Sequence, residues 1–321
     1  MRIIIYGGME IVMGIFNRDY NKPGKGIDKN APKKKGLNLF YDTYFRKFWD
    51  IIKLNLLFLV TSLPALAIVM LLAGGIANDL VGQYAPLAAK SMGLASVDTS
   101  NIELSKMIMA ADIGIRLFFG LAFIVLVGAG PTTAGLAYIL KCFVNEVPVF
   151  LVSDYFAAIK TNFKQSLAIW IIDLAVYTFA YYAIKLYGNM PAPMIYLKYV
   201  LYALIFFFTI LHFFIYHLMV SYKMPFMQLY RNSALFAIPS FPFCLLVFAV
   251  CGFILFIFPG IAMTAVSETI MAIFGIATIL IWIFLLYGTC GLIIEFNACR
   301  QVMKYIKEDH GVEEKENIHS R

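Results

Sequence analysis

Six stretches of this 321-residue chain are apolar over about 20 residues or more, the length that a helix needs to cross a bilayer. They cover residues 54–76, 117–140, 167–187, 199–221, 241–263 and 270–294. None of them shows the ten-residue polar/apolar alternation of a membrane β-barrel strand. The pattern therefore predicts an all-α polytopic membrane protein with six transmembrane helices.

The composition agrees with a membrane protein. Hydrophobic residues make up 61% of the chain, charged residues 14%, and the mean hydropathy is +0.80. Soluble domains are nearer half apolar and a quarter charged, so a soluble enzyme or a nucleic-acid-binding domain is excluded. The net charge of +7 comes from basic residues at the ends of the apolar runs, which indicates the lipid bilayer as the partner.

The distribution of basic residues predicts the orientation. Of the 26 lysines and arginines, 21 lie in the N-terminal segment through Lys53, the connections 141–166 and 222–240, and the tail after 295. Such segments stay in the cytoplasm under the positive-inside rule. We therefore expect both termini on the cytoplasmic side of a bacterial plasma membrane.

The chain divides by composition into three parts. Residues 1–43 are basic, rich in Pro and Gly, and expected to be mostly disordered in the cytoplasm, with Met13 as an alternative start. Residues 44–296 form the transmembrane domain, with an extracellular loop at 77–116 in which a helix begins near Asn101. Residues 297–321 form a charged cytoplasmic tail.

Three aromatic and basic segments precede pairs of spans, at residues 44–54, 153–166 and 223–236. Their apolar residues recur at helical spacing, which predicts amphipathic helices that lie at the membrane interface before they turn into a span. Two explanations stay open, a threefold internal repeat and convergence on the chemistry of membrane entry.

Ionisable and amide side chains inside the spans are the candidates for chemistry, because burying them in lipid is costly. Asp173, His212, His217 and Asn55 are candidate substrate-binding residues, and interhelical hydrogen bonds are the alternative role. The two histidines are five residues apart and do not share a helix face, so we expect no metal site. Glu295 is expected to be an interfacial residue that pairs with a base.

Small residues and prolines mark places where helices bend or approach closely. Gly130, Pro131 and Gly135 lie in the second expected span, where close packing is preferred over an unwound turn beside a cavity. Pro64 is expected to kink the first span. The five cysteines are interpreted as packing residues. The chain has no phosphate-binding loop and no zinc-protease or serine-hydrolase motif, so we expect neither an enzyme nor a cofactor.

Three segments resemble the YesL-like family of bacterial membrane proteins, a family of unknown function: FRKFWDIIKLNLLFLVTSLP (45–64), GPTTAGLAYILKCFVNEV (130–147) and DYFAAIKTNFKQSLAIW (154–170). The resemblance extends over about residues 13 to 300 and is weakest in the long loop 77–116. It implies a polytopic protein, often encoded near carbohydrate uptake systems and glycoside-degrading enzymes. It supplies no binding residues that could be transferred to this chain.

Three functions follow as hypotheses. The resemblance favours an accessory or regulatory component of oligosaccharide uptake that docks on the permease or ATPase subunits of an ABC transporter. The polar residues in the spans favour a stand-alone transporter or channel with a site in the inner leaflet. A membrane scaffold or signalling protein is the third alternative, and association into a homo-oligomer stays open for all three.

Overall fold

The structure is a computed structural model that describes residues 36–94, 96–97, 100–264 and 268–306. The expectations for residues 1–35, including the start at Met13, and for 307–321 lie outside these ranges. The chain divides into two units, Met1–Leu39 and Phe40–Arg321, and the contacts discussed below all lie within the second. Every regular element among the described residues is a helix.

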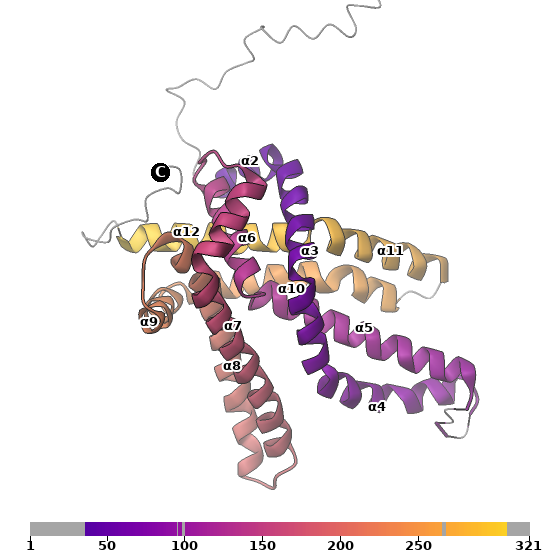
Figure 1. The fold of residues 1–321 in the computed structure, drawn as a ribbon. Coiled ribbons are helices and arrows are strands. Elements are labelled where there is room, and N and C mark those ends of the chain that lie inside the picture. The colour runs from indigo at the N-terminus through magenta and orange to yellow at the C-terminus, as the bar shows by residue number, and fades with distance from the viewer. Residues whose placement is uncertain (1–35, 95, 98–99, 265–267, 307–321) are drawn as a thin grey trace, which may run out of the picture. The chain divides into compact units, whose positions relative to one another are not determined.

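The helices in chain order are α2 (Leu37–Arg46), α3 (Phe48–Leu72), α4 (Gly74–Ser91), α5 (Ile102–Leu126), α6 (Pro131–Val144), α7 (Leu151–Gly188), the short 3₁₀ helix η1 (Met194–Tyr196), α8 (Leu197–Ser221), α9 (Phe226–Ala237), α10 (Phe241–Thr264), α11 (Glu268–Phe284) and α12 (Leu286–Ile306). Helices α4 and α5, α7 and α8, and α10 and α11 pack as three hairpins (Figure 1). Helix α6 packs against α7, α8 and α12, and its buried side chains form part of the core.

Four elements of the described chain are long and apolar enough to cross a membrane: α3, α5, α7 and η1–α8. Two bent pairs raise the number to six if each pair forms one span. Helices α9 and α10 meet at 94°, and helices α11 and α12 meet at 57°. A multi-pass helical membrane protein with four to six spans follows, and the prediction of six corresponds to its upper limit.

The second span was expected at residues 117–140, and this boundary is wrong. The spanning helix α5 covers Ile102–Leu126 and ends at a break, after which α6 begins with Pro131 at its first position. Within the break, Gly128 and Gly130 have φ angles of +116° and +65°. These angles favour glycine, so the continuous apolar run is not a continuous helix.

Helix α7 is longer than expected. Its 38 residues run without interruption from Leu151 to Gly188 and measure about 57 Å. The expected turn between an interfacial helix at 153–166 and a span at 167–187 is therefore absent. No proline or glycine interrupts the helix before its end, so the backbone has no reason to turn there.

Helices also occupy most of the segment expected to be an extracellular loop. Residues 77–91 belong to α4, and the next helix starts after Asn101, as predicted. The side chain of Asn101 caps this helix by accepting a hydrogen bond of 3.1 Å from the backbone N–H of Leu104.

Candidate functional site

Asp173 of α7 and His212 of α8 form a buried pair. The Nε2 atom of His212 lies 2.9 Å from Oδ1 of Asp173, and its Nδ1 atom lies 2.9 Å from the carbonyl oxygen of Phe208. The carbonyl only accepts, so Nδ1 is the donor in that hydrogen bond. Nε2 and Oδ1 then need a second proton between them. The hydrogen bond between Nε2 and Oδ1 therefore shares one further proton, which sits either on the imidazole or on the carboxyl group.

Tyrosines surround this pair on the helices that pack around it. The hydroxyl groups of Tyr177, Tyr216 and Tyr230 all interact electrostatically with Asp173. No hydrogen bond of ordinary geometry reaches the Oδ2 atom of Asp173 or the hydroxyls of Tyr216 and Tyr230, although the Tyr230 hydroxyl lies near Asp173 and the Tyr216 hydroxyl near the backbone of Gly130. Unpaired buried polar atoms are uncommon and often mark a functional position.

A row of polar side chains leads along α7 to the pair. Asp173, Tyr177, Tyr181 and Lys185 are four residues apart and share one helix face. Tyr177 shares a hydrogen bond of 2.7 Å with Thr209 of α8. We name these four residues the polar face of α7.

The far end of the polar face contacts α4. Tyr181 donates a hydrogen bond of 2.7 Å to Asp79, and the Lys185 ammonium group lies 2.7 Å from the same carboxylate. Helix α4 is not a candidate span. The hydrogen bonds from Lys185 and from Tyr181 lower the pKa of Asp79 below its ordinary value of 3.8.

The polar face borders a cleft of about 1030 Å³. Most of the lining is apolar or aromatic and comes from α3, α5, α7, α8 and α10. Tyr177, Tyr181 and Lys185 line it together with Asp79 and Thr209. A large apolar cleft with a few convergent polar groups is the usual form of a small-molecule site.

A second, smaller cavity of about 50 Å³ lies between α5, α6, α8 and α12. His212, Tyr216, His217 and Glu295 line it, so both histidines face the same space. Leu126 and Val127 line both this cavity and the large cleft. The break after α5 thus separates the cleft from the buried histidines.

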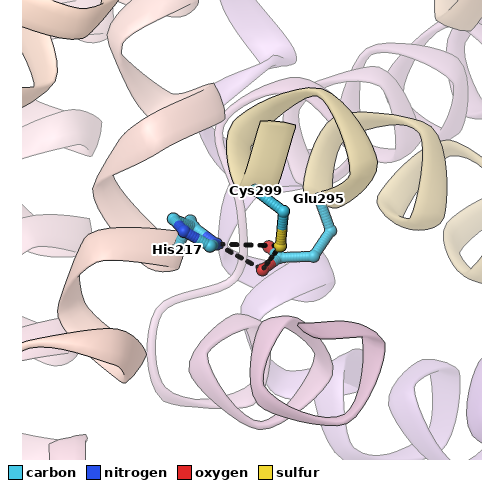
Figure 2. A group of neighbouring side chains, drawn as sticks. All are labelled: His217, Glu295 and Cys299. Atoms are coloured by element: carbon cyan, nitrogen blue, oxygen red, sulfur yellow. Dashed lines mark hydrogen bonds and ion pairs between the residues drawn. The ribbon is translucent and has the colours of Figure 1, made fainter. Parts of the chain in front are cut away.

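His217 belongs to a different cluster from His212. Figure 2 shows His217 of α8 facing Glu295 and Cys299 of α12. The His217 Nδ1 atom lies 2.5 Å from Oε1 of Glu295, and Cys299 Sγ lies 3.8 Å from the same Nδ1. Glu295 pairs with a base, as predicted, and its carboxylate is buried between the helices.

Asn55 contacts the backbone at the break between α11 and α12. Its side-chain amide donates to the carbonyl of Ile283 at 2.7 Å, and its oxygen accepts from the N–H of Gly288 at 2.8 Å. The bend frees these backbone groups in an environment without water. Of the two roles considered for Asn55, the contacts match the interhelical hydrogen bond.

The glycine and proline positions have separate roles. Gly130 is the last residue of the unwound turn, Pro131 is the first residue of α6, and the turn lies beside the small cavity, which Gly128 lines. A Cβ atom at Gly135 would lie 2.8 Å from the ring of Tyr155, so this glycine permits close packing of α6 on α7. Pro64 lies inside α3, which continues without a break to Leu72.

The sequence did not indicate that Cys299 or Asp79 takes part in these clusters. The spacing of Glu295 and Cys299, four residues apart, was a usable signal, because it places both on one face of a helix. The partner His217 is 78 residues earlier and follows from the packing alone. The four-residue spacing of the polar face of α7 is likewise visible in the sequence.

These features define a helical membrane protein with buried ionisable groups between its helices. Residues 113–184 match a protein family of unknown function, DUF624. The match covers less than a quarter of the chain and includes the break, α6 and Asp173. No curated protein and no solved structure matches the chain.

Proposed function

We propose that the protein is a membrane transporter that binds a small polar solute in the cleft and exchanges the proton of the Asp173–His212 pair during transport. The observation that carries this proposal is the polar face of α7. It connects the hydrogen-bonding groups in the cleft with the buried Asp173–His212 pair, whose hydrogen bond requires a shared proton. Ionisable side chains in such positions are typical of proton-linked carriers.

The chemistry of the cleft suits a solute with both apolar faces and hydroxyl groups. Aromatic rings of Phe118, Phe123 and Tyr177 line it beside the charged groups of Asp79 and Lys185. Sugars stack their C–H faces on such rings and hydrogen-bond through their hydroxyls. A saccharide is therefore the solute to test first, in agreement with the family resemblance.

The test measures uptake into vesicles that contain the purified protein. Labelled glucose, maltose and maltotriose are supplied with and without an inward proton gradient, and a pH-sensitive dye inside reports proton entry. We expect one of these sugars to accumulate with proton entry in the wild type. In Asp173→Asn the coupled accumulation is lost, because the amide cannot exchange a proton.

The matched control is Asp50→Asn, which makes the same change at a half-exposed carboxylate that pairs with Lys47 and Lys53. This variant is expected to transport like the wild type. Absence of sugar-coupled proton entry in wild-type vesicles, or full coupling in Asp173→Asn, would contradict the proposal.

A second candidate is an accessory component of carbohydrate uptake that docks on an ABC permease or ATPase subunit. It is favoured by exposed apolar side chains on the first half of α7 and on α9, among them Val152, Phe156, Phe163, Met227 and Leu235. Purification of the tagged protein from native membranes in mild detergent tests this candidate. A permease or ATPase in equal amount supports it, whereas recovery as a monomer or homo-oligomer argues against it.

A further inference from the structure

We propose that His217, Glu295 and Cys299 bind a divalent transition-metal ion of the zinc type and thereby link α8 to α12. Their three ligand atoms lie within 4.8 Å of one another, and all three residues are buried (Figure 2). An imidazole, a thiolate and a carboxylate are the ligands that zinc takes in proteins. Magnesium and calcium prefer oxygen ligands and fit this set poorly.

The distances agree with a tetrahedral site. Zinc bonds of about 2.0–2.1 Å to nitrogen, 2.0–2.2 Å to oxygen and 2.3 Å to sulfur place the sulfur about 3.6 Å from each of the other ligand atoms. Cys299 Sγ lies 3.8 Å from Nδ1 of His217 and 3.7 Å from Oε1 of Glu295. The nitrogen and oxygen lie 2.5 Å apart as a hydrogen-bonded pair and must separate by about 0.9 Å when they bind the ion.

The charges of the ligands also suit a dication in a buried place. A thiolate at Cys299 and a carboxylate at Glu295 together neutralise a charge of about +2, so the occupied site carries no net charge. The cavity of about 50 Å³, which His217 and Glu295 line, has room for water as a fourth ligand.

The experiment titrates the full-length protein in detergent with Co²⁺ and Zn²⁺ after removal of bound metal with a chelator. We expect one Co²⁺ per chain, with the near-ultraviolet thiolate-to-metal absorption band of a cobalt–sulfur bond, and displacement of Co²⁺ by Zn²⁺. In Cys299→Ala the band is absent. Its metal affinity falls at least about 100-fold, because loss of even an outer-shell partner costs about 10–100-fold.

The control is Cys244→Ala, which removes another buried cysteine, on α10, outside the cluster. It keeps the band and the stoichiometry. If Cys299→Ala does not fold, Glu295→Gln is titrated instead and is expected to lose affinity in the same way. No band in the wild type, or an undiminished band and affinity in the folded variant, overturns the proposal. The Asp173–His212 pair is not part of this site. Neither result therefore bears on the transport proposal, which the vesicle experiment tests separately.

Discussion

At the scale of single residues, two buried polar side chains inside the helix bundle have different roles. Asp173 pairs with one histidine, and its second oxygen has no hydrogen bond of ordinary geometry, whereas both polar atoms of the Asn55 side chain are hydrogen-bonded to the backbone. The hydrogen-bonded amide stabilises the fold, whereas the carboxyl group is the one to which we assign proton exchange in the proposed transport. Sequence position alone does not distinguish these two roles.

Asn55→Ala is therefore expected to lower stability without a direct effect on the cleft. The substitution leaves the carbonyl of Ile283 and the N–H of Gly288 unpaired in a buried place. The free energy of unfolding should fall by about 2–4 kcal/mol, at about 1–3 kcal/mol for each group. Denaturant unfolding in detergent, followed by circular dichroism, measures this loss.

The control for this prediction is Asn232→Ala on α9. The amide of Asn232 reaches only the sulfur of Met224, at 3.2 Å, and a bond to such a weak acceptor contributes less than about 1 kcal/mol. Equal losses of stability in the two variants would show that the hydrogen bonds of Asn55 to the break between α11 and α12 contribute no more than an ordinary weak bond.

At the scale of helices, the break between α5 and α6 depends on glycine. Gly130 has a φ of +65° and a ψ of −123°, a combination that other residues rarely adopt. A Cβ atom there would also lie 3.1 Å from that of Trp170. Backbone conformation, rather than hydrophobicity, ends α5 at this point.

Gly130→Ala should consequently lower the free energy of unfolding by about 1–3 kcal/mol, the usual cost of a strained backbone. Gly275→Ala in α11 is the matched control, because a Cβ atom there meets no other atom within 4 Å. It should raise stability by about 0.5–1 kcal/mol through helix propensity. A lower free energy of unfolding in Gly130→Ala together with a higher one in Gly275→Ala supports the glycine-dependent break between α5 and α6. If neither variant loses stability, this role of Gly130 is wrong.

The contact between α4 and α7 predicts a dependence of stability on pH. The folded protein lowers the pKa of Asp79, so the carboxylate contributes stability that is complete above its unfolded pKa, near 3.8. The contribution declines as the pH falls from that value through the lower folded pKa. Because Asp79 is accessible to solvent, salt also weakens it.

The measurement compares melting temperatures of the wild type and Asp79→Asn across this pH range. We expect the wild type to melt higher by the same margin from neutral pH down to about 4 and the margin to vanish below the folded pKa. If the difference in melting temperature between the wild type and Asp79→Asn grew as the pH fell, the ion pair with Lys185 would not be its cause.

At the scale of the whole molecule, the described helices allow four to six spans, and the charge distribution predicts both termini in the cytoplasm. Four spans and six spans both agree with cytoplasmic termini, because an even number of crossings returns the chain to the side on which it began. The difference concerns only the two bent pairs, α9–α10 and α11–α12. A connection exposed outside the cell between α10 and α11 distinguishes six spans from four.

Reporter fusions test this topology. Alkaline phosphatase, which is active only outside the cytoplasm, is expected to be active when fused after Met92, Asn189 or position 266, and inactive after Glu146 or Met224. A fluorescent protein at the C-terminus should mature in the cytoplasm. An inactive fusion at 266 with all other results unchanged would support four spans instead of six.

The sequence by itself determined the class of the molecule. Long apolar runs can satisfy their backbone groups in lipid only as helices, so the helical membrane fold follows from local composition. The start of α5 after Asn101 and the candidate positions Asp173 and His212 also follow from local chemistry. These features depend on neighbours within a few residues or on the cost of burying a charge.

Only the tertiary structure decided which polar groups meet. His212 pairs with Asp173, whereas His217, five residues later on the same helix, turns to Glu295 and Cys299. Hydropathy also missed the break before Pro131, since glycine and alanine carry no polar side chain and leave the apolar run uninterrupted. Such pairings depend on the rotation and register of packed helices, and these are set by contacts between segments far apart in the chain.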